Sequence, residues 1–418
     1  MKTKAVRLYG KDDLRLEEFE LPEIKDCEIL AKVVSDSICM SSFKAAEQGA
    51  DHKRVPNDVA KNPTIIGHEF CGEIIKVGSK WAKDFAPGQK FSIQPAMNYK
   101  GSLYAPGYSY QFIGGDSTYV VIPNEVMETN CLLKYNGEAY FYGSLAEPMS
   151  CIVGGFHVNY HMQPGIYKHE MGIKEGGSFA ILAGAGPMGL GAIDYAIHSD
   201  RKPSLVAVTD IDQARLDRAS SILSPAEAEK NGVKLVYVNT AEKGEEALME
   251  LTGGKGYDDI FVFAPVKSVV EMGDRILGRD GCMNFFAGPV DSQFKAEFNF
   301  YNVHYGQTHL ASNSGGNTDD MVEALKMMES GTIDPSVMVT HVGGLNAVVE
   351  TTLNLPKIRG GKKLVYTHID MPLTAIEDFE KLGKTDPMFA QLDKLVKENN
   401  GLWSAKAEKY LLANAKEI

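Results

Sequence analysis

The chain has few cysteines and no closely spaced cysteine pairs. Six cysteines occur among 418 residues, and none of them forms a C-x-x-C pair or a short-range framework. In a chain of this length that pattern indicates reduced thiols rather than a disulfide scaffold. Most of these cysteines are expected to be small buried side chains, so a functional cysteine has to be argued individually.

Long apolar runs and an excess of positive charge are also absent. No stretch approaches the roughly 18 apolar residues of a membrane-spanning helix, and the first residues lack a secretory core. The net charge of −12 disfavours nucleic acid and anionic membrane as partners, because both attract basic surfaces. An acidic chain can still contain a basic pocket for a small anionic substrate. We therefore expect a cytoplasmic protein with no membrane or nucleic-acid partner.

The pattern of apolar residues changes along the chain. The first part has short alternating and β-branched runs separated by glycine, proline and asparagine, which is typical of a β-rich domain. From Gly177 onward, apolar strand-like runs alternate with helical stretches, which indicates a parallel sheet covered by helices. These patterns predict an α/β protein with domains at 1–151 and 152–312. In residues 313–418 we expect a helix, an apolar strand and two tail helices separated at an Asn-Gly pair.

Gly184, Gly186 and Gly189 form a G-x-G-x-x-G turn between an expected strand and an expected helix. The next strand ends in Asp210, about 20 residues farther on, which is the spacing of a dinucleotide site. In such a site Gly184 makes the tight turn and Gly186 lets the backbone approach a pyrophosphate. Gly189 then allows close packing of the helix on the strand. Without this context the same glycines would be an ordinary turn of a parallel sheet.

The residues around the turn refine the coenzyme prediction. Pro187 and Met188 lie at the helix N-terminus, which would receive the negative charge of the pyrophosphate. Asp210 would accept hydrogen bonds from ribose hydroxyls and repel a 2′-phosphate, which favours NAD(H) over NADP(H). Arg215 could instead approach such a phosphate, so the choice of coenzyme stays open.

Three segments of the first half carry residues that bind metals in other proteins: "DSICMSSFKAA", "IIGHEFCGE" and "SLAEPMSC". Cys39 and His68 offer a thiolate and an imidazole, and Glu69 and Glu147 add carboxylates. Such a mixed set fits a catalytic zinc with an open position. Each residue alone has a simpler explanation, namely a buried cysteine, a hydrogen-bonded histidine, or a solvated or capping glutamate. Pro148 predicts a helix that starts just after it.

Together these segments resemble the zinc-dependent medium-chain dehydrogenases, in the branch of the sorbitol and threonine dehydrogenases. Cys39, Gly67-His68-Glu69 and Glu147-Pro148-Met149 occur in the family's order, and the similarity covers about residues 1–366. The resemblance implies a GroES-like catalytic domain and a Rossmann coenzyme domain, with a return to the catalytic domain after residue 312. Among sugar-related members, the phrase "SNSGGNTDDM" and the extended C-terminus are most similar to the L-sorbose-1-phosphate reductases.

The resemblance implies a role for each candidate ligand. Cys39 and His68 would bind zinc, and Glu69 would bind it in the resting state. Glu147 would bind it directly or through the metal-bound water. The four-cysteine lobe that holds a structural zinc in many relatives has no cysteine in the corresponding residues 94–115, so one zinc is expected.

Other residues are assigned by the same resemblance. Ser41 would pass the substrate proton outward. Lys44 would end that relay, anchor a substrate phosphate, or be an ordinary surface lysine. Lys362 and Lys363 precede the last strand, and Lys363 is the closer match to a basic residue that contacts the coenzyme pyrophosphate. An ordinary charged turn would look the same.

The implied reaction is hydride transfer from NAD(P)H to a ketone polarised by zinc, and in reverse the oxidation of an alcohol. The implied substrate pair is L-sorbose 1-phosphate and D-glucitol 6-phosphate, with an unphosphorylated polyol or another hexitol phosphate as the alternative. A non-zinc reductase or a binding protein of the superfamily is a more distant alternative. The family also implies a homo-oligomer, a dimer or a tetramer. The basic residues that could hold a phosphate are scattered in the sequence: Lys44, His52, Lys53, Arg54 and Arg359.

Overall fold

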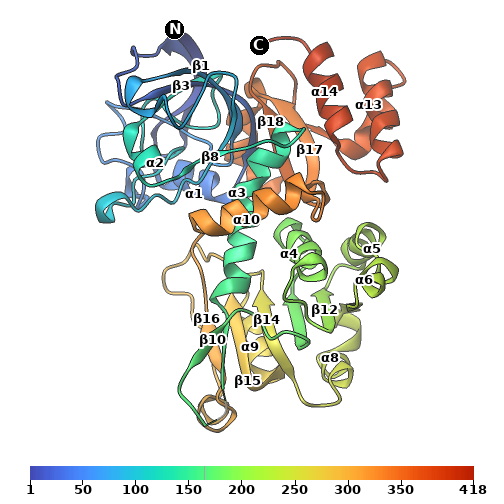
Figure 1. Ribbon diagram of the computed structural model, residues 1–418. Helices are drawn as coiled ribbons and strands as arrows, with labels where there is room; N and C mark the ends of the chain where they lie inside the picture. The colour runs from blue at the N-terminus through green and yellow to red at the C-terminus, as the bar shows by residue number, and fades with distance from the viewer. Residues whose placement is uncertain (164) are drawn as a thin grey trace. The chain divides into compact units, whose positions relative to one another are not determined.

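The computed structural model describes residues 1–163 and 165–418, and the chain divides into two compact units (Figure 1). Unit 1 consists of three segments, Met1–Pro148, Asn317–Glu329 and Val339–Ile418. Unit 2 consists of Met149–Gly316 and Ser330–Met338. The boundaries expected from the sequence, after residues 151 and 312, stay proposals beside this division.

Unit 1 is built around a large sheet whose central strand is β3 (Ile29–Ile38). This strand pairs antiparallel with β5 (Cys71–Val77), with β7 (Tyr119–Ile122) and with β18 (Lys362–Tyr366). The strand order is β19-β17-β18-β3-β5-β6-β8. The other strands are β6 (Lys90–Ile93), β8 (Leu132–Lys134), β17 (Val339–Gly344) and β19 (Thr374–Ala375). The β-rich first domain predicted from the sequence is thereby confirmed.

A smaller sheet of unit 1 has the order β2-β1-β4. It is formed by β1 (Lys2–Gly10), β2 (Asp13–Glu20) and β4 (Thr64–Ile65). Ala5, Val6 and Leu8 of β1 are fully buried, so this part of the strand is covered on both faces. The helices of unit 1 are α1 (Met40–Gln48), α2 (Asn124–Glu128), α10 (Thr318–Glu329), α11 (Val348–Asn354) and α12 (Phe379–Leu382).

The tail of the chain forms two further helices, α13 (Pro387–Glu398) and α14 (Ala405–Asn414), which lie side by side (Figure 1). Asn400 and Gly401 between them have positive φ, which ends one helix and lets the chain reverse, so the predicted break at Asn-Gly is confirmed. The buried Trp403 donates its indole N–H to the Tyr366 hydroxyl at 2.7 Å. The tail therefore packs on unit 1.

Helix α3 (Tyr140–Val158) begins earlier than the sequence predicts. Pro148 lies inside the helix, so the expected helix start just after it is wrong. The start is set by Glu408 of α14, whose carboxylate accepts hydrogen bonds from the backbone N–H groups of Tyr140 and Phe141, at 2.6 and 2.9 Å. This carboxylate satisfies N–H groups that have no partner within the helix, and it faces the positive end of the helix dipole. A cap supplied from so far along the chain leaves no local signal near residue 140.

Unit 2 has a parallel six-stranded sheet with the order β13-β12-β11-β14-β15-β16. Counted within the sheet this is the order 3-2-1-4-5-6 of a doubly wound Rossmann sheet, which confirms the predicted fold class. The strands are β11 (Ser178–Leu182), β12 (Leu205–Asp210), β13 (Lys234–Asn239), β14 (Tyr257–Val262), β15 (Leu277–Phe285) and β16 (His309–Ala311).

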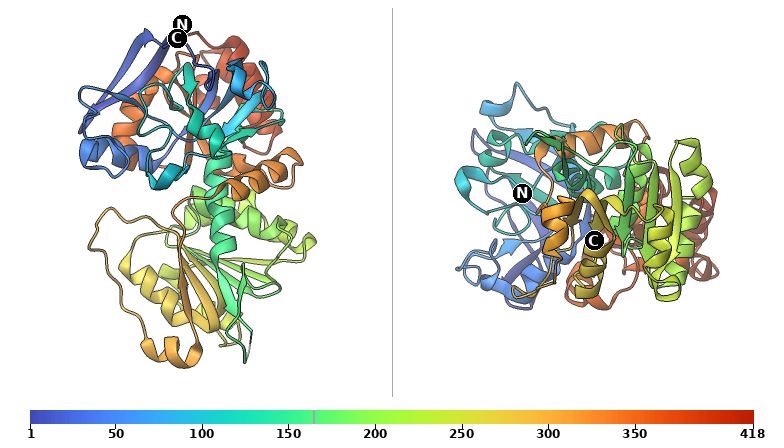
Figure 2. Two further views of the ribbon diagram at one scale, coloured as in Figure 1. Left: turned by 60° about the vertical axis from the view of Figure 1, so that its left-hand side comes forward. Right: turned by 90° about the horizontal axis from the view of Figure 1, so that it is seen from below.

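Helices lie on both faces of this sheet (Figure 2). They include α4 (Pro187–His198), α5 (Gln213–Ile222), α6 (Pro225–Lys230), α7 (Thr240–Lys243), α8 (Glu246–Leu251) and α9 (Lys267–Ile276). The strands β11 and β12 consist mainly of buried apolar residues because both faces of the sheet are covered. A short hairpin of β9 (Tyr160–Met162) and β10 (His169–Met171) completes the unit. No helix in the described part of the chain is long and apolar enough to cross a bilayer.

Candidate functional site

The first metal-ligand candidate lies where the central strand of unit 1 ends. Cys39 follows β3 directly and is the N-cap residue of α1, with extended backbone angles. A residue between a strand end and a helix start presents its side chain at the edge of the sheet. Ser41 lies in the first turn of α1, and its Oγ is 3.4 Å from Cys39 Sγ. The sequence prediction of a cysteine and a hydroxyl in one place is consistent with this geometry.

The second candidate segment lies in the loop between β4 and β5. Gly67 has a φ of +87°, and a Cβ there would lie 2.4 Å from an Asp36 carboxylate oxygen, so only glycine fits. This glycine orients the next two residues. Ligand atoms of Cys39, His68 and Glu69 all lie within 4.8 Å of one another. Within residues 1–163 and 165–418 this is the one group of three or more such ligand atoms.

His68 is buried and contacts hydroxyl groups on both sides of its ring. Ser42 Oγ lies 3.3 Å from Nδ1, and the Tyr108 hydroxyl lies 3.2 Å from Nε2. Burial lowers the pKa of His68, so the ring is neutral at physiological pH and can act as a ligand. The Tyr108 ring also packs on the imidazole, with 4.7 Å between ring centroids. Sequence reasoning missed Tyr108, since neither spacing nor motif singles it out in its aromatic-rich loop.

Glu69 has a partner that the sequence analysis did not identify. Lys362 Nζ donates to both carboxylate oxygens, at 2.5 and 2.7 Å, and both side chains are almost completely buried. Burial alone would lower the pKa of Lys362, but the Glu69 carboxylate outweighs it and raises the pKa. Lys363 is the next residue of the strand, so its side chain points to the opposite face of the sheet from Lys362. A signal for Lys362 existed in the two adjacent lysines, which the structure places inside β18 and not before the strand as the sequence analysis expected, but only the sheet register shows which one faces the site.

Glu147 of α3 is buried near the same centre without belonging to the three-residue group. Burial raises the pKa of Glu147 to about 7, against the opposite effect of His68. The charges of Cys39, Glu69 and Lys362 also act on it, which places its carboxylate in their neighbourhood. Whether it binds a metal directly or through water stays a prediction.

The chemistry of this donor set fits zinc. A thiol, an imidazole and a carboxylate within 4.8 Å of one another are typical zinc ligands, and three protein ligands leave a position open for a substrate. Burial raises the pKa of Cys39, and the Glu69 carboxylate raises it further. A bound divalent cation reverses this effect, because a coordinated thiol loses its proton.

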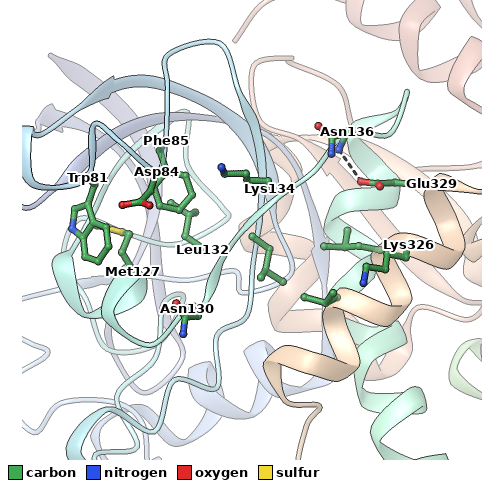
Figure 3. Close-up of a pocket in the computed structure, with 13 residues that line it drawn as sticks. Trp81, Asp84, Phe85, Met127, Asn130, Leu132, Lys134, Asn136, Lys326 and Glu329 are labelled. Atoms are coloured by element: carbon green, nitrogen blue, oxygen red, sulfur yellow. Dashed lines mark hydrogen bonds between the residues drawn. The ribbon is translucent and has the colours of Figure 1, made fainter.

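A hollow elsewhere in unit 1 does not contain these residues. It has a volume of about 530 Å³ and lies between the Trp81–Phe85 region and helix α10 (Figure 3). The backbone N–H of Asn136 donates to Glu329 at its rim. None of the predicted site residues lines it.

The glycine turn of unit 2 has the geometry of a pyrophosphate cradle. It joins β11 to α4, with Gly186 as the N-cap residue and Pro187 in the first helical turn. A Cβ on Gly189 would lie 2.1 Å from the carbonyl oxygen of Gly184, so this glycine is required for close helix–strand packing. A Cβ on Gly186 would meet nothing within 4 Å, so the backbone there is open to an approaching ligand. The turn therefore fits a dinucleotide at the N-terminus of α4, where Met188 also lies.

The residues expected to select the coenzyme lie after β12. Asp210 Oδ1 accepts hydrogen bonds from the backbone N–H groups of Ile211 and Asp212, which orients the carboxylate. Arg215 lies in the first turn of α5, and its Nε is 3.7 Å from Oδ2 of Asp212, the N-cap residue of that helix. Asp212 thus partly balances the charge that was expected to attract a 2′-phosphate.

Two other predicted residues have surroundings that bear on their roles. Lys363 is buried, and its Nζ donates to the carbonyl oxygens of Ile358, Arg359 and Gly361. Its contact with the coenzyme stays a prediction. Lys44 lies on α1 three residues after Ser41, so the two side chains share one face of the helix.

Comparisons with known proteins agree with this geometry. The zinc-binding dehydrogenase family matches residues 187–330, and the alcohol dehydrogenase GroES-like domain matches residues 25–130. L-sorbose 1-phosphate reductase of Klebsiella pneumoniae is 51% identical over 100% of this chain and 98% of its own. Mannitol-1-phosphate 5-dehydrogenase of Aliivibrio fischeri is 50% identical over 98% of this chain and 97% of its own. The uncharacterized protein YggP of Escherichia coli is 53% identical over 99% and 97%.

Solved structures show the same fold at lower sequence identity. The 2R,3R-butanediol dehydrogenase of Bacillus subtilis superimposes with a TM-score of 0.69 at 21% identity, covering 87% of this chain and 99% of its own. An alcohol dehydrogenase of Thermotoga maritima has the same TM-score at 19% identity, with coverage of 88% and 100%. From the full-length relatives and the two family matches, we conclude that the chain belongs to the zinc-binding dehydrogenases with a GroES-like domain, and that it is an alcohol-dehydrogenase-type oxidoreductase with zinc and a nicotinamide coenzyme as cofactors.

Proposed function

We propose that this enzyme reduces L-sorbose 1-phosphate to D-glucitol 6-phosphate with NADH or NADPH, and catalyses the reverse oxidation. The observation that carries the proposal is the group of Cys39, His68 and Glu69, with the Ser41 hydroxyl beside the thiol. The 51% identity to an L-sorbose 1-phosphate reductase over the full length supports the choice of substrate.

Zinc supplies a Lewis acid for the substrate oxygen, and the nicotinamide supplies the hydride. Cys39, His68 and Glu69 would hold the metal, with Glu147 as a direct or water-mediated ligand. In unit 2, Gly184, Gly186, Pro187, Met188 and Gly189 would hold the pyrophosphate, and Asp210 the ribose. The choice between NADH and NADPH would depend on whether Arg215 remains paired with Asp212 or turns toward a 2′-phosphate.

The proton that completes the reduction would come from Ser41. Its hydroxyl lies 3.4 Å from the Cys39 thiol, so it would be close to a substrate oxygen held at the metal. The Tyr108 hydroxyl lies in hydrogen-bonding range of Ser41 and contacts His68, so it can stabilise the Ser41 hydroxyl as a donor. In the oxidative direction the same hydroxyl would take the proton, with Lys44 as one route outward.

The initial rate of NADH and NADPH oxidation tests the proposal, with L-sorbose 1-phosphate and free L-sorbose as substrates. Turnover that requires the phosphate and disappears after treatment with a zinc chelator is the expected result. Turnover of free sorbose alone would move the assignment to a polyol dehydrogenase. Activity with neither ketose, in a protein that contains zinc, would overturn the named substrate.

A second candidate is another hexitol phosphate, which the 50% identity to a mannitol-1-phosphate 5-dehydrogenase favours. Oxidation of D-mannitol 1-phosphate, compared with D-glucitol 6-phosphate at equal concentration, separates the two.

The dimer or tetramer implied by the family stays a prediction, which light scattering of the purified protein checks.

A further inference from the structure

Tyr108 connects the candidate metal site to a group of basic side chains. One side of its ring packs on His68, as described above. The His52 ring is stacked on Tyr108 with 5.8 Å between centroids and an interplanar angle of 8°. The guanidinium carbon of Arg54 lies 5.2 Å from the same ring centre. His52, Arg54 and His68 therefore all contact the same tyrosine ring.

The charges of this group are all positive. Burial, together with the charges of the neighbouring Arg54, Lys53 and Lys44, lowers the pKa of His52 to about 4. Three cations are thus close enough to His52 to disfavour a fourth positive charge. In a chain with a net charge of −12, a local accumulation of positive charge of this kind requires an explanation.

Arg54 has no carboxylate partner in the part of the chain that the structure describes, and neither does Lys53 or His52. Other arginines of the protein do, for example Arg15 with Asp13 and Arg275 with Glu245. The Arg54 Nε atom is buried and has no hydrogen-bond partner. A buried guanidinium N–H without an acceptor is costly, which an anionic ligand would correct.

We propose that Arg54 and His52, with Lys53 and Lys44 around them, form the subsite for the substrate phosphate. This inference rests on the proposed function and specifies its substrate class further. The Arg54 guanidinium would bind two phosphate oxygens, as its planar fork favours. The His52 ring, held flat against Tyr108, would donate one hydrogen bond from its neutral form.

The position of the subsite predicts where the phosphate is attached. In L-sorbose 1-phosphate the ketone carbon is bonded to the carbon that carries the phosphate. In D-mannitol 1-phosphate, carbon 5 lies four bonds away from the phosphate-bearing carbon. Arg54 and His68 contact the same tyrosine ring, so the subsite would lie close to the candidate metal ligands and suit a phosphate on a carbon near the reacting carbon. The enzyme should therefore prefer substrates that react at the carbon next to the phosphate-bearing carbon.

The variant Arg54→Gln tests the subsite, with Arg15→Gln as a control that removes the same charge from another part of unit 1. The quantities to measure are the zinc content, KM and kcat for L-sorbose 1-phosphate, and kcat/KM for free L-sorbose. Arg54→Gln should retain zinc and raise KM for the phosphate ester by about 10- to 100-fold, the loss expected for a charge-assisted hydrogen-bond pair. It should change kcat/KM for free L-sorbose by less than about twofold. The control should match the wild type.

An unchanged KM in zinc-loaded Arg54→Gln, or an equal loss for both ketoses, would overturn the subsite. If Arg54→Gln does not fold, Arg54→Lys decides, because it retains the charge but loses the fork and should still raise KM. If no ketose is turned over at all, the proposed function fails, and inorganic phosphate then tests the subsite alone. Phosphate binding measured by calorimetry in the wild type and Arg15→Gln, but lost in Arg54→Gln, supports it; equal binding or none in all three overturns it.

The positional preference has its own measurement. Rates of oxidation of D-glucitol 6-phosphate and D-mannitol 1-phosphate are compared in the wild type at equal concentration. The subsite predicts a higher kcat/KM for D-glucitol 6-phosphate. A higher value for D-mannitol 1-phosphate would overturn the predicted attachment point.

Discussion

Glu69 shows how a single side chain can serve two partners. Its carboxylate belongs to the group of metal-ligand atoms, and it also forms a buried ion pair with Lys362. A buried carboxylate needs a positive charge nearby, because removing it from water is expensive. Lys362 supplies that charge whether or not Glu69 contacts the metal, so the carboxylate can leave the metal without becoming an isolated charge.

Replacing Lys362 with methionine should destabilise unit 1 strongly. The change leaves Glu69 charged and buried without its partner, and losses of about 3–5 kcal/mol are expected for such a broken pair. Urea unfolding followed by circular dichroism measures the change.

The double variant Lys362→Met/Glu69→Gln is the control for this prediction. It removes both charges and should recover a large part of the lost stability, because the penalty arises from the unpaired carboxylate. A double variant as unstable as Lys362→Met would show that the lysine acts through packing instead.

At the residue scale the sequence predicts the ligands better than their neighbours. Cys39, His68 and Glu69 lie in motifs, so their proximity was expected before the structure was known. Tyr108 and Lys362 come from other segments, and their contacts depend on loop conformation and sheet register. Neither the loop conformation nor the sheet register can be derived from a single sequence, because many tyrosines and lysines have similar neighbours along the chain.

At the scale of elements, two glycines of the same turn have different roles. Gly189 is needed for packing, and Gly186 is needed for access. These roles follow from the close contact of a Cβ at position 189 with Gly184 and the open space at position 186. A pair of alanine variants should therefore give different results.

Gly189→Ala should destabilise unit 2 by about 1–3 kcal/mol, the usual cost of overpacking. Gly186→Ala should leave stability within about 0.5 kcal/mol of the wild type, since its backbone angles suit any residue. Both should weaken NADH binding at least about tenfold, since one distorts the cradle and the other fills it. Urea unfolding and NADH fluorescence titration measure the two effects. Wild-type affinity in Gly186→Ala would contradict the assigned pyrophosphate position.

The cap of α3 gives a prediction about pH. Burial raises the pKa of Glu408 to about 7, although hydrogen bonds from Tyr140, Phe141 and Tyr366 oppose this. The unfolded chain ionises this carboxyl near its ordinary pKa of 4.5, whereas the folded chain retains the proton up to about 7. Between these values the folded state binds more protons, so its stability falls as pH rises, on the order of 3 kcal/mol for the whole window.

Glu408→Gln should remove this part of the pH dependence. Glutamine retains an oxygen that accepts from the helix N-terminus but has no proton to lose. Free energies of unfolding at about pH 5 and about pH 8, for wild type and variant, isolate the contribution of Glu408 from other buried carboxyl groups. Parallel pH profiles for the two proteins would contradict the prediction.

At the scale of the whole molecule, the two candidate cofactor sites are centred on different units. The candidate metal ligands lie in unit 1 and the glycine turn lies in unit 2. The pattern of apolar residues was sufficient to predict the architecture of both units, since β-rich and strand–helix patterns are clear over long stretches of sequence. The cap of α3 by the tail was not predictable, because it joins residues far apart in the chain.

Removing zinc should therefore abolish turnover without abolishing coenzyme binding. Dialysis against a chelator is expected to reduce kcat below about a hundredth of its value, while the dissociation constant for NADH changes less than about threefold. Metal analysis, initial rates and NADH fluorescence on the same sample check this. Loss of NADH binding together with zinc would show that the two sites depend on each other. Readdition of zinc should restore the rate.

The strand β18 has a consequence for how this protein is made. β18 pairs with residues 35–38 of β3, and it also carries Lys362 to Glu69. A ribosome that adds about 5–20 residues per second reaches β18 only after the whole of unit 2 has been synthesised. Until then the nascent chain has an unpaired edge on its central strand and a carboxylate without its counter-charge. The first unit to leave the ribosome is thus the last to be completed, and a chain interrupted before residue 362 would expose an edge prone to aggregation.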